Sequence, residues 1–181
     1  AKKKSVRVIT DCGVAPGMSN LILGRYNELM KIESFACYVG GLPVDRKPPF
    51  QYKAPFSPVD VIQEYIRPAR MVENGAIITK PALSDREILS FEEVGELEAF
   101  NTDGLRSLVL TMPHIPNMKE KTLRYPGHLD LICAMQQAGF FETSPIRVNK
   151  VDVSPLEFTS KLLVNQWKLE PGEKEFTVMK V

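Results

Sequence analysis

The residues best suited to chemistry lie at the end of a predicted strand, in the segment Gly95–Ser107. Apolar and polar residues alternate along its first part with a period of two, as in a pleated strand. Asn101–Gly104 are then turn and helix-cap residue types, followed directly by an apolar helical run. Such a corner places free backbone N–H groups and Arg106 where they can hold an anionic group. Simple helix capping by Thr102 or Asp103 explains the same residues, and both interpretations stay open.

Arg67 and two strand carboxylates are further candidates. Arg67 stands directly before Pro68, at the end of a predicted helix that starts at Ser57. A guanidinium on such rigid backbone can clamp a carboxylate with two hydrogen bonds, or it can merely complement the helix dipole. Glu96 and Glu98 share a strand face. They can hold a substrate ammonium, or they can form a solvated face of the sheet.

The two histidines are candidate general acids or bases. His114 lies between prolines, which favours an ordinary loop residue, and His128 begins a predicted helix, where it can titrate, cap or pack. Walker, His-Glu-x-x-His and Gly-x-Ser-x-Gly motifs do not occur in the sequence. It also lacks the strand–Gly-x-Gly-x-x-Gly–helix unit, so these residues are not expected to bind a dinucleotide pyrophosphate in the usual way.

Whole-chain totals exclude several functional classes. The 181 residues carry 23 Lys and Arg against 22 Asp and Glu, a net charge of +1, so a nucleic-acid partner is not expected. No apolar run reaches the roughly 18 residues of a membrane span, and the first residues do not resemble a signal peptide. Three cysteines without a C-x-x-C pair predict neither a disulfide framework nor a metal site, and a cytoplasmic location is expected.

Prolines, glycines, cap residues and hydrophobic periodicity position the elements around these candidates. Helices are expected over about 19–30, 57–67, 105–110, 128–138 and 155–167. Strands are expected at 6–10, 33–40, 70–73, 76–80, 86–91, 95–100, 117–125, 148–153 and 175–181. Because the chain lacks an initial Met and both ends fall in predicted strands, we expect a piece of a longer enzyme.

The expected architecture is α+β. Asn74-Gly75 joins two short strands in the clearest hairpin of the sequence, and a purely parallel, doubly wound sheet would lack it. We therefore expect a mixed, largely antiparallel sheet with helices packed on one face. No repeat or internal linker interrupts residues 1–181, which predicts one domain.

Five stretches, in order and covering nearly the whole chain, resemble the saccharopine dehydrogenase and lysine 6-dehydrogenase family. They are DCGVAPGMSN (11–20), YVGGLP (38–43), YKAPFSPVDVIQEYIRPAR (52–70), GELEAFNTDG (95–104) and TLRYPGH (122–128). The similar part of the family is its second domain, which carries substrate-binding and dimer-forming surfaces. Agreement around RPAR, ELEAFNTDG and LRYPGH looks closer to the lysine 6-dehydrogenase side than to the glutamate-forming saccharopine dehydrogenase side.

The resemblance implies a fold like the C-terminal domain of glyceraldehyde-3-phosphate-dehydrogenase-like two-domain oxidoreductases. It also implies that the parent uses NAD or NADP, held by a nucleotide-binding domain missing here, so that no cofactor is expected on this piece alone. Its implied substrate-binding residues are Arg67, Asn101, Thr102, Asp103 and Arg124. Cys12 and Gly13 would border the nicotinamide, and His128 or Asp103 would accept the proton.

The sequence therefore supports two functional hypotheses. The first is the substrate-binding domain of an NAD(P)-dependent oxidoreductase of lysine metabolism, which acts on a C–N bond of an amino acid and is inactive as this piece alone. The alternative is a homodimerisation or assembly module with no catalytic activity of its own.

Overall fold

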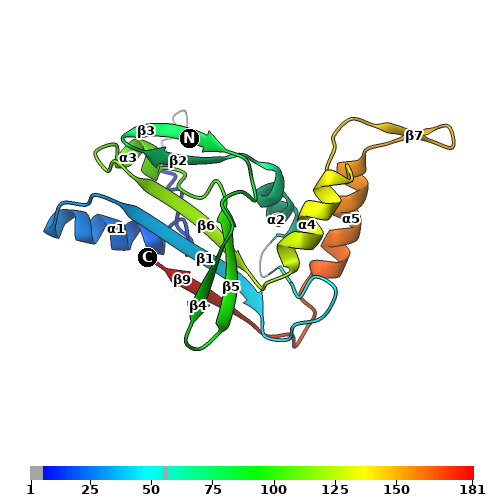
Figure 1. Ribbon diagram of the computed structural model, residues 1–181, viewed down its shortest axis with the longest axis horizontal. Coiled ribbons are helices and arrows are strands. Elements are labelled where there is room, and N and C mark those ends of the chain that lie inside the picture. Colours follow the sequence, from blue (N-terminus) through cyan, green and yellow to red (C-terminus); the bar gives the residue numbers. More distant parts are fainter. Residues whose placement is uncertain (1–5, 55–56) are drawn as a thin grey trace.

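The computed structural model describes residues 6–54 and 57–181, and it consists of a central sheet with helices beside it and at one end (Figure 1). The helices are α1 (Met18–Leu29), α2 (Pro58–Ile66), α3 (Leu108–Thr111), α4 (His128–Gln137) and α5 (Pro155–Trp167). The strands are β1 (Phe35–Pro43), β2 (Ala69–Glu73), β3 (Ala76–Lys80), β4 (Glu87–Phe91), β5 (Gly95–Asn101), β6 (Met118–Arg124), β7 (Ile146–Val148), β8 (Val151–Val153) and β9 (Glu175–Lys180).

The seven-stranded sheet is organised around β6. Its main path runs β3-β2-β6-β1-β9, and β5, which pairs with β4, also pairs with β6. The first part of β6 meets β2 at the Val72–Met118 pair, and its later part meets β5 from Asn101 to Glu98. Among the strand pairs described for this sheet, β1–β6 is parallel and the others are antiparallel. The prediction of a mixed, largely antiparallel sheet is confirmed.

Two separate clusters fix the helices. One packs α1 and α3 against β1, β2 and β6 through residues such as Leu23, Cys37 and Met118. The other gathers α2, α4 and α5 around Trp167 and Phe100, at the end of the sheet (Figure 1). The opposite sheet face has a cluster that consists of strand residues and their connections. Helices therefore cover one face only in part, because three of the five pack on one another beyond the strand ends.

Several local predictions are confirmed by backbone geometry. Asn74 and Gly75 have φ values of 52° and 79° in the β2–β3 turn, as a two-residue hairpin requires. Gly139 follows α4 with a φ of 85°, a typical helix end. The Ser154 hydroxyl accepts a hydrogen bond from the Glu157 backbone N–H at 3.4 Å, which caps α5.

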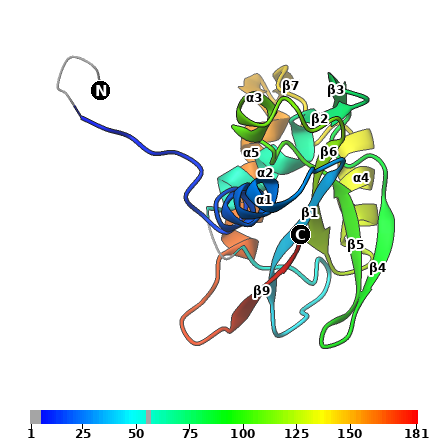
Figure 2. The ribbon, with the colours of Figure 1, turned by 90° about the vertical axis from the view of Figure 1, so that its left-hand side faces the viewer.

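Three predicted elements are wrong in whole or in part. Val6–Thr10 forms no strand: all five residues are exposed, and Figure 2 shows this segment leading away from the sheet. A β-pattern needs a neighbouring strand for its backbone hydrogen bonds, and no strand among the described residues pairs with this segment. Residues 148–153 form the β7–β8 hairpin through Asn149-Lys150 rather than one strand. The helix predicted from Leu105 begins only at Leu108, after Arg106 at a φ of 49°.

Candidate functional site

A cleft of about 620 Å³ lies where the loop before α1, the end of α2, the corner after β5 and strand β6 meet. It contains the predicted residues Cys12, Gly13, Arg67, Thr102 and Asp103. Its ionisable lining is Asp11, Asp60, Glu64, Arg67, Asp103, Arg106 and Glu120. Carboxyl and guanidinium groups side by side can hold both ends of a zwitterion.

The corner after β5 is a rigid wall of this cleft. The Asp103 carboxylate accepts hydrogen bonds from Arg70 Nε at 2.8 Å and Arg70 Nη2 at 3.0 Å, and a third from the Arg70 backbone N–H at 3.2 Å. Although burial raises the pKa of Asp103, these bonds outweigh it and hold the pKa below its usual value. Asp103 is therefore a fixed carboxylate and a poor proton acceptor. Thr102 joins the corner to β6 through a 2.9 Å hydroxyl contact with Thr122.

Two guanidinium groups of the cleft are free to bind a ligand. Arg67 follows the last residue of α2, is exposed and lines the cleft. Arg106 lines the cleft from the corner after β5 and is also exposed. Within residues 6–54 and 57–181, neither side chain makes an ion pair or a hydrogen bond. A ligand carboxylate would therefore displace no ion-pair or hydrogen-bond partner from the described part of the chain.

The loop Asp11–Gly13 forms the rim of the cleft. Asp11 Oδ2 accepts a hydrogen bond from the Ser107 backbone N–H at 3.1 Å, which ties the rim to the start of α3. Cys12 and Gly13 are exposed at this rim. They are accessible to a molecule that approaches from outside the domain.

Glu120 is the residue that sequence reasoning missed. It is 4% exposed, lines the cleft from β6, and its carboxyl makes no hydrogen bond with the described part of the chain. Burial, followed by the charges of Glu64, Asp103 and Asp11, raises its pKa to about 8, against an opposing effect of Arg106. The available signal was the polar row Glu120, Thr122 and Arg124 on one face of a central strand.

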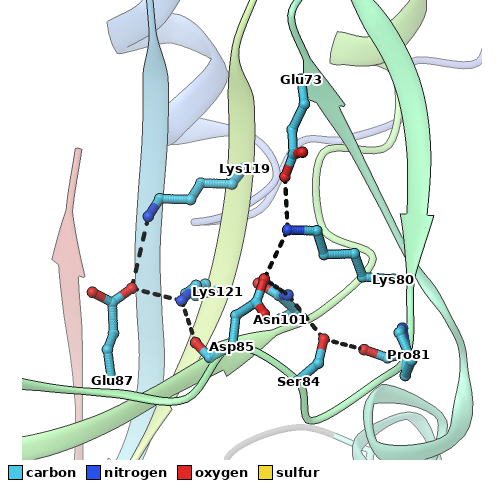
Figure 3. A network of polar contacts seen from close by, with 9 residues as sticks. All are labelled: Glu73, Lys80, Pro81, Ser84, Asp85, Glu87, Asn101, Lys119 and Lys121. Atoms are coloured by element: carbon cyan, nitrogen blue, oxygen red, sulfur yellow. Dashed lines mark hydrogen bonds and ion pairs between the residues drawn. The ribbon is translucent and has the colours of Figure 1, made fainter.

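Asn101 lies outside the cleft. Successive strand residues point to opposite faces, so Asn101 is on the face opposite Thr102, where its Nδ2 donates to Ser84 Oγ at 3.0 Å and to Asp85 Oδ2 at 2.9 Å (Figure 3). The same network contains the Lys121–Glu87 pair at 2.6 Å. Asn101 thus supports the loop between the two hairpins and lines a second cavity, of about 510 Å³, on that face; its part in substrate binding stays a prediction.

Arg124 lies behind the cleft wall. Its guanidinium is 2% exposed, donates to Glu64 Oε2 at 3.0 Å and to Tyr65 Oη at 3.1 Å, and stacks 4.3 Å from the centre of the Tyr52 ring. Burial raises the pKa of Glu64, and the Arg124 charge opposes that shift. Arg124 therefore positions Glu64, which does line the cleft, and does not reach a ligand directly.

His128 is also buried away from the cleft, at 1% exposure. Its Nδ1 lies 2.9 Å from the Phe50 carbonyl oxygen, and its Nε2 lies 2.9 Å from Tyr65 Oη. Burial, together with the Arg124 charge, lowers the pKa of His128 to about 3. Both ring nitrogens of His128 are engaged and the residue is not among those that line the cleft, so it is a poor candidate for direct proton transfer there. His114 is an exposed loop residue, 2.7 Å from Asn27 Oδ1.

The neutral His128 predicts acid-sensitive stability. An unfolded histidine has a pKa near 6.5, above the folded value of about 3, so its contribution is complete above pH 6.5 and decreases as the pH falls. We expect the free energy of unfolding to drop by about 2 kcal/mol from this group between pH 7 and pH 5. Urea denaturation at both pH values measures the drop.

Two variants separate this effect from other acid-sensitive groups. His128→Gln should show a smaller loss between pH 7 and pH 5, whereas His114→Gln, at an exposed loop site, should keep the wild-type loss. Equal losses in wild type and His128→Gln would contradict the assignment.

Among the described residues, no group of three or more His, Cys, Asp and Glu side chains is arranged to hold a metal ion. In the same part of the chain, no helix combines the length and apolar character needed to cross a bilayer.

Together the fold and the cleft define an α+β domain with a polar cleft of mixed charge. Residues 13–181 match the family described as Saccharopine dehydrogenase C-terminal domain. The chain belongs to this family, so the family resemblance stated from the sequence is confirmed.

Individual relatives agree with this assignment. The chain is similar to the mitochondrial alpha-aminoadipic semialdehyde synthases of Bos taurus, at 24% identity over 170 residues, and of Rattus norvegicus, at 31% over 170 residues. Each match covers 87% of this chain and 18% of the relative, so the chain spans less than a fifth of these relatives' length.

A solved structure supports the fold. Apo histidine-tagged saccharopine dehydrogenase (L-Glu forming) from Saccharomyces cerevisiae superposes with a TM-score of 0.54 and 18% sequence identity. The match covers 85% of this chain and 39% of that one. The closer likeness to lysine 6-dehydrogenase and to glyceraldehyde-3-phosphate-dehydrogenase-like domains stays a prediction.

Proposed function

We propose that this chain is the substrate-binding domain of an NAD(P)-dependent oxidoreductase that acts on a C–N bond of an amino acid. The observation that carries the proposal is that one cleft contains two guanidinium groups without an ion pair among the described residues, Arg67 and Arg106, together with the buried carboxyl of Glu120 and the half-buried carboxyl of Glu64. An amino acid presents the complementary charges, a carboxylate and an ammonium. Membership of the saccharopine dehydrogenase family is consistent with such a substrate.

In this proposal the protein supplies position. Arg67 and Arg106 hold a substrate carboxylate, the carboxyl groups hold the substrate nitrogen, and the fixed Asp103–Arg70 pair keeps the wall between them rigid. NAD or NADP, when bound to the whole enzyme, supplies the hydride acceptor. Cys12 and Gly13 are exposed at the rim, and they are the residues of this chain that would contact the nicotinamide.

Exposed apolar residues near the rim support a second domain. Val8 and Ile9 are 70% and 82% exposed, and Leu21 of α1 is 76% exposed. Such side chains are covered when another unit packs against them. We propose that residues 1–181 are one domain of a longer enzyme and that the nucleotide-binding domain of the same chain covers this surface. Homodimer formation and a cytoplasmic location stay predictions.

Replacement of Arg67 tests the proposal. Saccharopine, the compound named for the structural relative, serves as the probe, and its dissociation constant is measured by isothermal titration calorimetry. Arg67→Ala should weaken binding by at least tenfold, because a charged hydrogen bond contributes about 1.5–3 kcal/mol. Arg25→Ala, which removes an exposed cation of α1, should leave the dissociation constant unchanged. A value for Arg67→Ala within twofold of wild type would remove the carboxylate clamp.

A further inference from the structure

We propose that Glu120 binds the substrate nitrogen and shares a single proton with it, a role that rests on the proposed function of the cleft. Glu120 is only 4% exposed, yet it lines the cleft. Its carboxyl makes no hydrogen bond within residues 6–54 and 57–181. Its oxygen atoms are not among the fully enclosed side-chain atoms that lack a partner, so they are reached from the cleft. A ligand group in the cleft can therefore donate a hydrogen bond to this carboxyl.

The chain leaves space for this carboxyl on the opposite wall. A Cβ at Gly104 would overlap the Glu120 Oε1 and Cδ atoms. No positive φ accounts for glycine at this position. The absence of a side chain at residue 104 therefore has a steric reason, which is to let the Glu120 carboxyl lie against the corner and face the cleft.

The charges around Glu120 favour a cationic nitrogen as its partner. The titratable and charged groups that face it are Asp11 of the rim, Cys37 of β1, Asp60, Glu64 and Arg67 of α2, and Asp103 and Arg106 of the corner. Burial and then the Glu120 charge raise the pKa of Cys37 to about 12, so this neighbour stays a neutral thiol. Arg70 and Arg124 lie behind Asp103 and Glu64 and are already engaged by them.

One proton can therefore be exchanged when a ligand binds. With a pKa of about 8, the free Glu120 is mostly protonated at pH 7, and a free amino-acid nitrogen carries its own proton as an ammonium. The bound pair needs only one proton between oxygen and nitrogen, so the other leaves to solvent. When the shared proton lies on Glu120, the nitrogen lone pair would be free to form a C=N bond to the adjacent carbon. NAD or NADP, if bound to the proposed parent, would supply the acceptor for the hydride of that carbon.

Calorimetry with saccharopine as the probe tests this exchange. Heats of binding are measured at pH 7 in phosphate and in Tris, whose ionisation enthalpies differ, so their difference counts released protons. Wild type should release about 0.9 proton more than Glu120→Gln at pH 7, and this excess should vanish at pH 9.5. Glu92→Gln, in the exposed turn between β4 and β5, should release as many protons as wild type.

A second measurement does not depend on ligand. Carbon-13 NMR of side-chain-labelled glutamate should show one carboxyl that titrates near pH 8 in wild type and is missing in Glu120→Gln. Binding without a proton difference between wild type and Glu120→Gln would overturn the inference while leaving the proposed function in place. Failure of wild type to bind saccharopine would overturn the proposed function and this inference together.

Discussion

Replacing Gly104 with alanine is expected to destabilise the protein and to displace Glu120. The added methyl group would overlap the carboxyl of Glu120, which is enclosed at 4% exposure. The overlapped atoms are the far end of a flexible side chain that faces the cleft, so the carboxyl can move aside and the loss should lie near the lower end of the about 1–3 kcal/mol that overpacking costs. Urea denaturation of wild type and Gly104→Ala measures this loss. The displaced carboxyl should also weaken saccharopine binding by at least tenfold.

A matched glycine and a double variant isolate the cause. Gly24 lies inside α1, and a Cβ added there would meet no neighbouring atom within 4 Å. Gly24→Ala should therefore be neutral or stabilising, since alanine favours helix. Glu120→Ala should restore most of the stability lost in Gly104→Ala, because the two side chains then no longer overlap. Strictly additive losses in the double variant would show that Gly104 and Glu120 do not interact.

The local signals of the sequence predicted most of the elements. Proline and cap residues located α2 and α5, and Asn74-Gly75 located the β2–β3 hairpin. These signals are reliable because they act within a few residues of the chain. Val6–Thr10 had the same strand-like composition but has no strand beside it, and a strand depends on a partner that its own sequence does not contain.

The candidate site was only partly predictable for a similar reason. Thr102 and Asp103 do reach the cleft, but Asn101 points to the other sheet face, which strand alternation alone would have indicated. Glu120 comes to the cleft through the pairing of β6 with β1 and β5. Its burial and its raised pKa arise from segments distant in sequence, so no short motif carried the information.

The histidine illustrates how tertiary contacts decide chemistry. Histidine usually titrates near neutral pH, and for this reason His128 was a candidate general base. In the fold, Phe50 and Tyr65 occupy both ring nitrogens and Arg124 adds a nearby positive charge. In this domain the residue that titrates near neutral pH is therefore a glutamate and not the histidine. His128 is held neutral, whereas the pKa of Glu120 is raised to about 8.

The largest loss of stability is expected for Arg124→Met. Methionine has an unbranched side chain of similar length to arginine, but it is apolar. The variant therefore removes the guanidinium that donates to Glu64 and Tyr65. Breaking a buried ion pair leaves one charge without compensation and costs about 3–5 kcal/mol, a large share of the 5–15 kcal/mol that stabilises a typical domain. Urea denaturation at pH 7 measures the loss.

Two comparisons make the Arg124 prediction specific. Arg147→Met breaks the Arg147–Asp152 pair of the β7–β8 hairpin, whose side chains are 62% and 65% exposed, so its loss should stay below about 1 kcal/mol. Arg124→Lys should recover only part of the stability. A lysine ammonium restores the positive charge, but its donors lie on one atom, and it cannot stack its plane on Tyr52 as the guanidinium does. A loss in Arg124→Met no larger than that in Arg147→Met would mean that Glu64 is neutral in the folded protein. The cleft would then have one negative charge fewer with which to attract an ammonium, and recognition of the substrate nitrogen would rest more heavily on Glu120.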